Sequence, residues 1–413
     1  MENKPRIRFK GFTEDWEQRK LNDFGIATGG TSIESEFVDE GAYKVISIGS
    51  YSEESVYNDQ GLRVNKTGKT KSRILNKDDL TMILNDKTSS GNIIGRVLLI
   101  DQDNTYVYNQ RTERIEVDTK NFLPMFLYHM LNAPEQRKYI VKASQGNTQI
   151  YVNWSTISNI NYMIPTLPAE QEKIAYLFSL INKDITLHQC KLEKLKLTKK
   201  SLLQKLFPKN GKRIPEIRFK GFTDAWEQRK LGDIATFSKG NGYSKSDLVP
   251  SGSPIILYGR LYINYETIIK NVDTFVELKD KSVISQGGEV IVPASGETAE
   301  DISRASVVEK QGNVIGGDLN VIKVKELLHP TFLALTISNG EQQKELSKRA
   351  QGKSVVHLHN SDLQEVNLIF PLLNEQKEIS ILFEKIDNII TLHQCKLERL
   401  KEVKRGLLQK MFV

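Results

Sequence analysis

Residues 170–207 read EQEKIAYLFSLINKDITLHQCKLEKLKLTKKSLLQKLF, and residues 375–412 read EQKEISILFEKIDNIITLHQCKLERLKEVKRGLLQKMF. The two stretches agree at 23 of 38 positions and share the string ITLHQCKLE. In both, apolar side chains recur at alternating spacings of three and four residues, the heptad-like pattern of a long helix. Each stretch is therefore predicted to form one helix with an apolar stripe, about 57 Å long at 1.5 Å per residue.

An apolar stripe of this length needs a partner, and each helix is the obvious partner for the other. Antiparallel pairing would bring the two centres together at His188 and His393, which both lie on the stripe. Cys190 and Cys395 follow two residues later. Because residues at i and i+2 point to different faces of a helix, we favour a polar layer that fixes the register over a metal site.

A second repeated element precedes each variable region. Residues 5–24 read PRIRFKGFTEDWEQRKLNDF and residues 215–234 read PEIRFKGFTDAWEQRKLGDI, with 15 of 20 positions identical. The repeat unit is therefore about half the chain. If the repeat closes on itself, the first RFKGFT segment lies beside the end of the C-terminal helix and gives a circular pseudo-symmetry. We interpret Trp16 and Trp226 as packing anchors of this repeated frame.

The stretches between the repeats, residues 25–165 and 235–370, are largely unlike each other in sequence. Both nevertheless contain short β-rich runs, then a helical stretch (residues 124–144 and 330–350), then a Gln-Gly pair. The β-rich runs are residues 43–48, 80–84, 93–99 and 114–117 in the first region and residues 254–257, 289–292, 314–315 and 320–324 in the second. We expect the two regions to share one fold.

The predicted fold class is α+β, with two pseudo-symmetric mixed α/β domains separated by two long antiparallel coiled-coil helices. The first domain is expected at residues 1–167 and the first helix at residues 168–210. The second domain is expected at residues 211–372 and the second helix at residues 373–413.

The composition bounds the class of protein. The 413 residues suit two domains, and 39% hydrophobic with 26% charged residues is typical of a soluble globular chain. No apolar run is long enough to span a bilayer, no secretory signal is evident at the N-terminus, and two cysteines give no disulfide framework. The sequence therefore predicts a cytoplasmic protein without a membrane contact.

The net charge of +7 is unevenly placed along the chain. Residues 169–213 hold 11 Lys and Arg against 4 Asp and Glu, so the excess lies on the first long helix and the linker after it. The variable regions are not basic as wholes, so DNA binding there requires their charges to be sorted onto one face. A solvated lysine-rich helix face explains the net charge equally well.

Catalytic signatures are present only as near misses. Gly68 is followed by Lys-Thr as in a phosphate loop, but the upstream Gly61 is at the wrong spacing. Residues 237–242 are one residue too long for the F-x-G-x-G loop of adenine methyltransferases. Two Glu-x-Lys pairs lie on the long helices, without the upstream Pro-Asp that holds Mg²⁺ in nucleases. The chain is therefore predicted not to be an enzyme, to hold no metal and to need no cofactor of its own.

Three kinds of polar segment suit contact with DNA. Residues 66–73 (KTGKTKSR) are basic and suited to phosphates, and residues 109–112 (NQRT) carry side chains that read adenine and guanine edges. A polar loop follows the Gln-Gly pair in each region. The candidate DNA-binding residues are Lys66, Lys69, Lys71, Arg73, Asn109, Arg111, Gln145, Asn147, Gln149, Arg260, Gln351, Lys353, Ser354 and His357. For any single stretch, a solvated loop is the alternative.

The architecture resembles the specificity subunit of type I restriction–modification systems. The resemblance is carried by RFKGF and WEQRKL at residues 8–21, by their copies at residues 218–231, and by LPAEQ (167–171) and PLLNEQ (371–376). It covers essentially the whole chain.

The resemblance implies two target-recognition domains, each of which reads one half of a split, asymmetric site in double-stranded DNA, with the paired helices setting the gap. It also implies that two copies of a modification (methyltransferase) subunit dock on the helices and use S-adenosylmethionine. Restriction (translocase and endonuclease) subunits would supply activities that need ATP and Mg²⁺.

Two other classes of function compete with this interpretation. One is a coiled-coil scaffold that binds protein partners with little intrinsic DNA recognition, which the near-neutral variable regions favour slightly. The other is a self-sufficient nuclease or methyltransferase, which the missing motifs disfavour.

Overall fold

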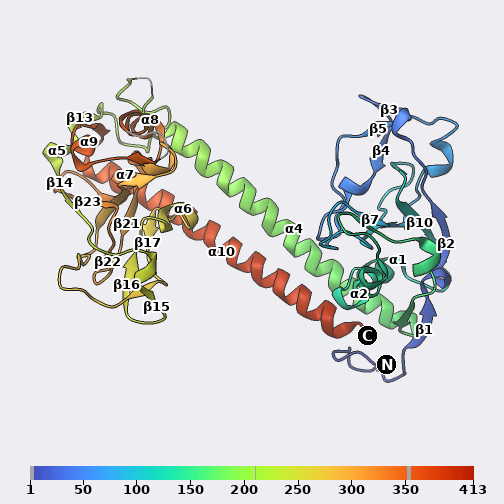
Figure 1. Ribbon diagram of the computed structural model, residues 1–413. Helices are drawn as coiled ribbons and strands as arrows, with labels where there is room; N and C mark the ends of the chain where they lie inside the picture. Colours follow the sequence, from blue (N-terminus) through green and yellow to red (C-terminus); the bar gives the residue numbers. More distant parts are fainter. Residues whose placement is uncertain (1–3, 210, 351–354) are drawn as a thin grey trace. The chain divides into compact units, whose positions relative to one another are not determined.

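The structure is a computed structural model that describes residues 4–209, 211–350 and 355–413. The chain divides into two compact units, one of residues 1–189 with 395–413 and the other of residues 190–394. Each unit contains one mixed α/β domain and part of two long helices, α4 (Pro168–Lys205) and α10 (Leu373–Met411) (Figure 1). In the part of the chain described, no helix is both long and apolar enough to cross a bilayer.

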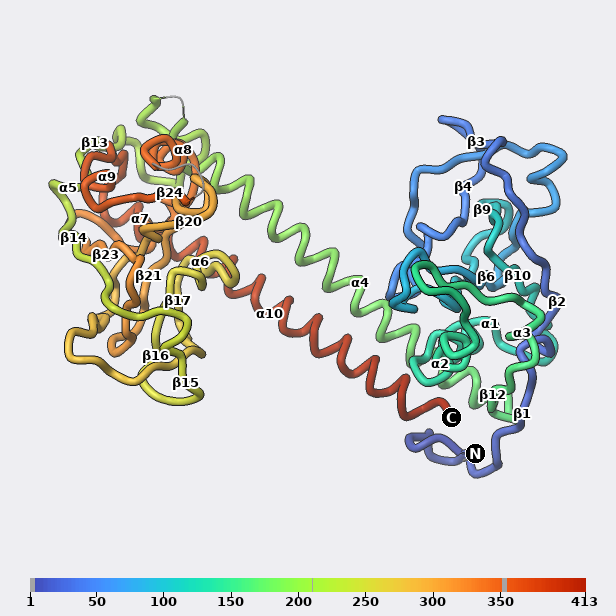
Figure 2. The backbone as a smooth tube through the Cα atoms, viewed as in Figure 1, coloured from blue at the N-terminus to red at the C-terminus, as the bar shows by residue number. Residues whose placement is uncertain are grey.

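The first domain is built on two four-stranded sheets (Figure 2). One is antiparallel, with the order β2 (Gly25–Gly29), β10 (Thr112–Val117), β6 (Leu80–Ile83), β8 (Val97–Leu99). The other has the order β3 (Phe37–Val38), β5 (Arg63–Val64), β4 (Tyr43–Ile46), β9 (Tyr106–Tyr108), with β4 and β9 parallel. Two short antiparallel pairs complete the strands: β1 (Glu17–Lys20) with β12 (Asn161–Ile164), and β7 (Asn85–Asp86) with β11 (Ile150–Tyr151).

Helices cover these sheets. The helical stretch predicted at residues 124–144 is two helices, α1 (Pro124–Leu131) and α2 (Pro134–Ala143). The break has a local cause, because Pro134 lacks the N–H that a continuous helix needs and disfavours a helical conformation in the residue before it. The remaining short helices are α3 (Trp154–Ile157), η1 (Leu21–Phe24), η2 (Glu34–Glu36), η3 (Ile48–Ser50) and η4 (Lys71–Arg73).

The second domain has the strands of the first in the same order, with one strand added. Its larger sheet runs β14 (Ala235–Lys239), β23 (Leu319–Val324), β19 (Glu289–Pro293), β21 (Ser306–Val308), β17 (Ile268–Ile269). Its smaller sheet runs β15 (Leu248–Val249), β18 (Phe275–Val276), β16 (Ser253–Ile256), β22 (Val314–Ile315). The short pairs are β13 (Glu227–Lys230) with β25 (Asn367–Phe370), and β20 (Ser295–Gly296) with β24 (Val356–His357).

The helices of the second domain are α5 (Leu231–Ile234), α6 (Arg260–Ile263), α7 (Pro330–Ile337), α8 (Gly340–Arg349), α9 (Asn360–Gln364), η5 (Lys245–Asp247) and η6 (Asp301–Ser303). Strand β17 and helix α6 are additions relative to the first domain. The predicted fold class and the expectation that two unlike sequences share one fold are confirmed.

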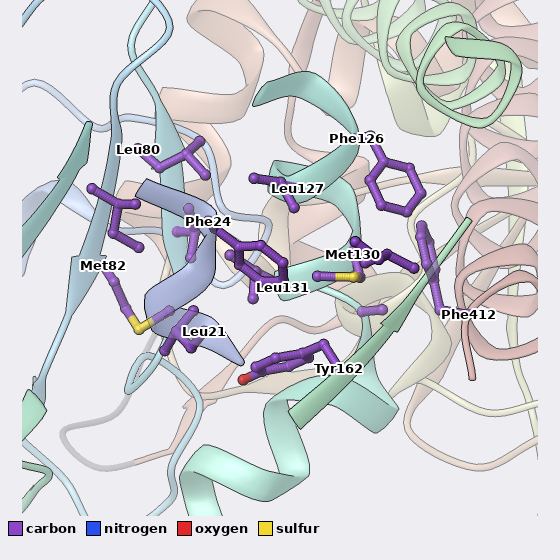
Figure 3. Close-up of a cluster of buried hydrophobic side chains, with 14 of the residues drawn as sticks. Leu21, Phe24, Leu80, Met82, Phe126, Leu127, Met130, Leu131, Tyr162 and Phe412 are labelled. Atoms are coloured by element: carbon purple, nitrogen blue, oxygen red, sulfur yellow. The ribbon is translucent and has the colours of Figure 1, made fainter. Parts of the chain in front are cut away.

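An aromatic cluster joins each domain to the long helices. In the first unit, the ring centre of Phe126 of α1 lies 6.4 Å from that of Trp16 and 5.8 Å from that of Phe412. The ring of Phe178 of α4 stacks on that of Phe412, with their centres 5.8 Å apart. Figure 3 shows Phe126 and Phe412 beside the apolar side chains of the core. The second unit repeats the cluster with Phe332, Trp226, Phe207 and Phe383. Both tryptophans are buried, so their interpretation as packing anchors is confirmed.

The same contacts show that the helices pair antiparallel within each unit. The first half of α4 meets the end of α10 through Phe178 and Phe412, and the end of α4 meets the first half of α10 through Phe207 and Phe383. His188 falls in the first unit and His393 in the second, so the polar layer stays a prediction. Cys190 and Cys395 are exposed free thiols.

A buried ion pair fixes the start of each long helix. Arg8 donates two hydrogen bonds to Glu170 at 2.6 and 2.8 Å, and Arg218 binds Glu375 in the same way at 2.7 Å twice. The carboxylates of both pairs are almost fully buried. A bidentate pair of this kind holds its partners in one geometry. The repeated RFKGF and EQ motifs are therefore two sides of one contact.

Backbone hydrogen bonds join the start of each repeat to the end of a long helix. The N–H of Ile7 donates to the carbonyl of Lys410 at 2.9 Å, and the N–H of Ile217 donates to the carbonyl of Lys205 at 3.0 Å. Figure 1 shows the start of the chain beside the end of α10. The prediction that the first RFKGFT segment lies beside the end of the C-terminal helix is confirmed.

Replacing Glu170 by Ala is expected to destabilise the first unit by about 3 kcal/mol, because Arg8 is left buried without its counter-ion. Glu375→Ala should do the same to the second unit alone. Hydrogen exchange of each unit in increasing urea measures both effects. Glu193→Ala, which removes an exposed pair with Lys196, is the matched control and should change stability by less than about 0.5 kcal/mol. Equal effects of all three variants would contradict the role of the pair.

His129 of α1 introduces an acid-sensitive group into the first core. It is buried, its ring lies 5.2 Å from that of Phe178, and burial together with the charge of Lys404 lowers its pKa to about 3. Leu335 occupies the matching position of α7. Because an unfolded histidine binds a proton below about pH 6.5 and this one does not, stability is complete above pH 6.5 and falls as the pH drops towards 3.

The first unit of the natural chain should therefore lose about 2 kcal/mol between pH 7 and pH 5 through His129. His129→Leu, which copies the second unit, should remove that loss. Urea unfolding of both proteins at the two pH values measures it. An undiminished acid loss in the variant would assign the effect to other groups.

Candidate nucleic-acid interface

The candidate segments of the first domain meet around the turn η2. Lys69 donates to Ser35 at 3.0 Å and lies 3.6 Å from Glu36. On the other side, Asn109 donates to Glu34 at 3.0 Å. The basic segment at residues 66–73 and the polar segment at residues 109–112 are thus brought to one place, as their common assignment to DNA binding requires.

Glu34 organises this turn. Its carboxylate accepts hydrogen bonds from Ser32, Asn109 and Gln110, and these donors lower its pKa to about 2 in the order Ser32, then Asn109. The side-chain oxygen of Asn109 also accepts the N–H groups of Ile33 and Gln110 at 3.1 and 2.8 Å. Asn109 is buried and engaged on all sides, so it supports the loop that displays its neighbours.

The cations of this region differ in their exposure and in their hydrogen-bond partners. Lys66 and Lys71 are exposed. Arg73 is half-buried, donates to the hydroxyl of Tyr108 at 3.0 Å and lies over the ring of Tyr108 at 5.5 Å. The two lysines suit contacts with phosphates, which need charge and reach more than fixed geometry.

Arg111 occupies a strained position at the tip of the loop before β10. Its φ is +65°, a conformation that costs energy for a residue with a side chain, and its carbonyl accepts the N–H of Leu84 at 2.8 Å. The second domain repeats this geometry at Asp318, with φ of +42° and the N–H of Ala294 donating to its carbonyl at 2.7 Å. Both side chains are exposed. The same loop tip therefore carries opposite charges in the two domains.

The Gln-Gly loop of the first domain lies next to this tip. Gln145 exchanges two backbone hydrogen bonds of 2.9 Å with Tyr151, and Val152 donates to the carbonyl of Leu84, the residue that binds Arg111. Asn147 and Gln149 are exposed on the loop. The three predicted segments of this domain are thus neighbours in space.

The candidates in the second domain are distributed differently. Arg260 is mostly buried and donates to Asp273 at 3.0 Å and to Glu266 and the carbonyl of Asn271 at 2.8 Å, so its guanidinium is already engaged. His357 is exposed on β24, with its ring parallel to that of His359 at 6.4 Å. Gln351, Lys353 and Ser354 lie outside the described residues.

Sequence reasoning missed two features of this surface. Asp318 was not a candidate because the equivalence with Arg111 is visible only in the backbone. The exposed polar segment around Lys87 follows β7, a two-residue strand that leaves almost no pattern in a sequence. Burial alone would raise the pKa of Asp86 in that strand, but hydrogen bonds from Ile93 and Thr88 lower it, so a charged carboxylate fixes the segment.

Comparison with known proteins agrees with this two-fold plan. The family model described as "Type I restriction modification DNA specificity domain" matches residues 13–197 and again residues 223–402. The chain belongs to this family. It is a DNA sequence-recognition subunit, and each match covers one of the two recognition domains. The alternative of a scaffold with little DNA recognition is not favoured.

Curated relatives and solved structures match nearly the whole chain. The type I restriction enzyme MjaVIII and MjaIX specificity subunits of Methanocaldococcus jannaschii are 22% and 23% identical, over 96% of this chain and 91% and 93% of their own. The crystal structure of a type I restriction–modification S subunit from M. genitalium aligns over 99% of both chains with a TM-score of 0.67 at 14% identity. A chain from a structural study of type I R-M complex assembly and conformational transition covers 96% of this chain and 97% of its own, with a TM-score of 0.52 at 15% identity.

Substitutions of the loop-tip residues and of the lysines should affect DNA binding in different ways. If Arg111 reads a base, Arg111→Ala is expected to relax discrimination at one base pair of one half-site by about 10- to 100-fold, the effect of losing a bidentate contact to guanine. Lys71→Ala should weaken all sequences alike and lower the salt slope by about 1. Competition binding of the complete complex to randomised half-sites at several salt concentrations measures both.

Asp318→Asn is the matched control for the other half-site and should leave the first half unchanged. A uniform loss of affinity in Arg111→Ala, with no change in base preference, would place Arg111 on the phosphates instead.

Proposed function

We propose that each recognition domain reads one half of a split, asymmetric site in double-stranded DNA. The observation that supports this most directly is the pair Arg111 and Asp318, which stand at the same strained loop position with opposite charge. Arginine suits the acceptors of guanine and a carboxylate suits the amino group of cytosine. Two domains that keep one frame and vary its tip are suited to read different bases.

Within the first domain, the roles divide by exposure and geometry. Lys66, Lys69 and Lys71 would neutralise phosphates, whereas Arg111 and the exposed loop residues Asn147 and Gln149 would reach base edges. Arg73, Asn109 and Gln145 would hold this surface in shape, through Tyr108, Glu34 and the β11 backbone respectively.

In the second domain, Asp318 and His357 are exposed and suited to base contact. Gln351, Lys353 and Ser354 remain candidates on the sequence pattern alone. Arg260 would act as a brace for the segment around Asn271, because its guanidinium is held by neighbouring oxygen atoms.

The long helices would set the gap between half-sites. Helix α4 is 38 residues long and helix α10 is 39 residues long, both without interruption, and each contributes to both units. Recognition sites on one face of B-DNA lie about 34–36 Å apart for each helical turn, and a rod of about 57 Å spans such a distance.

The same helices would dock the partner subunits. They expose large apolar side chains, among them Leu180 and Leu187 of α4 and Leu392 of α10, which are 45%, 47% and 67% exposed. Such residues on an otherwise polar helix suit a protein partner. Two copies of a modification subunit would bind here and bring S-adenosylmethionine, and restriction subunits would bring the activities that use ATP and Mg²⁺. The chain itself would recognise cytoplasmic DNA and catalyse nothing.

The proposal is tested by co-expressing the chain with its modification subunit and mapping methylated adenines across a test genome. A split, asymmetric motif with a fixed gap is expected. Exchanging residues 235–370 for those of a relative should change one half only. Inserting one heptad after Gln189 and another after Gln394 lengthens both helices by about 10 Å and should widen the gap by about three base pairs.

A soluble complex without a new methylated motif would contradict DNA recognition. An insertion that changed the bases read and left the gap unchanged would contradict the role of the helices while leaving base reading intact.

A further inference from the structure

The first unit contains a cavity of about 650 Å³ between its domain and the two long helices. Ser55, Arg96 and His129 line it from the domain, Asn182 from α4 and Lys404 from α10. All of its lining residues belong to the first unit. Its volume is that of a small-molecule site.

Two partly buried cations, Arg96 and Lys404, line this cavity, together with the exposed Arg405. Among the described residues, neither Arg96 nor Lys404 has a carboxylate within 4.0 Å. Arg96 donates instead to the carbonyl of Asn92 at 2.9 Å and to Ser55 at 3.2 Å. Burial lowers the pKa of both cations, and their mutual repulsion lowers that of Lys404 further. Two like charges share a partly desolvated space, which a bound anion would relieve.

The second unit shows how the same position is neutralised internally. Lys199, the repeat partner of Lys404, forms an ion pair of 2.5 Å with Asp387. Arg304 corresponds to Arg96. The residue after each arginine donates its N–H to the side chain that follows α7 or α1, Ala305 to Ser338 and Val97 to Asn132. Arg304 forms an ion pair of 2.9 Å with Asp301. In the second unit, Lys199 lines two cavities, of about 100 Å³ and about 640 Å³.

The first unit has no carboxylate at either of these counter-ion positions. Asn182 stands where the second unit has Asp387, and Ile93 stands where it has Asp301. The first unit therefore has both cations without the internal carboxylates that pair with them in the second unit. A structural role does not account for these cations without their pair partners, because an unpaired buried charge is costly.

The remaining polar groups of the cavity suit an oxygen-bearing ligand. His129 is 2% exposed and its Nε2 atom has no hydrogen-bond partner among the described residues. It lies on the cavity wall and is neutral, so it has a free donor or acceptor for a bound molecule.

Four carboxylates also border the cavity, at its exposed rim. Glu53 accepts a hydrogen bond from Asn92 at 2.9 Å, and Glu398 pairs with Lys401 at 3.1 Å. Glu54 and Glu402 are exposed to solvent. These groups reduce the long-range potential but leave the two cations without a close anion, so binding is expected to depend on contact and not on net charge.

We propose that this cavity is a binding site for a small anion with phosphate or carboxylate groups, which takes the place that Asp387 and Asp301 fill in the second unit. Arg96 and Lys404 would bind its oxygen atoms, and Asn182 and His129 would hydrogen-bond to them. The second unit carries its own anions at this position and would not bind. The site is independent of which bases the recognition domains read.

Isothermal titration of the full chain with pyrophosphate, and separately with citrate, tests the site at constant ionic strength held by NaCl. One saturable site per chain is expected, and the anion that binds more tightly identifies phosphate or carboxylate as the preferred group. Hydrogen exchange should show protection of α1 and of the cavity-lining part of α10, and none at α7.

Asn182→Asp supplies the internal carboxylate and should weaken binding at least about tenfold while the protein stays folded. Lys404→Met, which removes one cation, should do the same and guards against a folding defect in the first variant. Asp387→Asn in the second unit is the matched control and should leave the affinity of the first unit unchanged. No saturable binding of either anion to the natural chain, or unchanged affinity in both first-unit variants, would overturn the proposal.

Discussion

The buried pair of Arg8 with Glu170, repeated as Arg218 with Glu375, is the contact on which the rest of the structure depends. It fastens the RFKGF segment to the first turn of a long helix. The next residue of each helix, Gln171 or Gln376, binds the backbone just before α1 or α7 and the proline that ends the last strand. Two adjacent side chains thus join the start of the repeat, the domain and the helix. Replacing one member of such a pair would leave the other charge buried without a partner, which explains why both residues are identical in the two copies.

This frame leaves the interior of each domain free to change. Once the first and last strands and the start of the helix are fixed, the sheets need only apolar residues of suitable size at their inward positions. Met82 in the first domain and Val292 in the second, for example, both serve as buried core residues. The loop tips carry no packing constraint at all. Arg111 and Asp318 share a backbone conformation but no chemistry, which is what a family of recognition domains with different targets requires.

The fold was predictable because its decisive elements are long or repeated. The periodicity of apolar residues predicts the helices α4 and α10. The order of the two repeats predicts that the first RFKGFT segment lies beside the end of α10. The candidate site was less predictable for a physical reason. Asn109 and Arg260 have the side chains of base readers, yet both are already engaged. The amide of Asn109 is bound by the N–H of Ile33 and the carboxylate of Glu34. The guanidinium of Arg260 is bound by oxygen atoms of Asp273 and Asn271. Asp318 has no sequence signal, because a left-handed φ at a non-glycine residue is set by the surrounding strands and not by its own identity.

The differences between the two units carry as much information as their likeness. The aromatic clusters of the two units match residue for residue. The surroundings of the two stripe lysines do not match. Lys199 is paired with Asp387, while Lys404 and Asn182 line a cavity without an ion pair between them. Desolvating a cation without a counter-ion destabilises a fold, and a change to Leu or Met would have been the simple remedy. A partly buried cation without a close carboxylate weakens the fold, and a role in binding accounts for its presence.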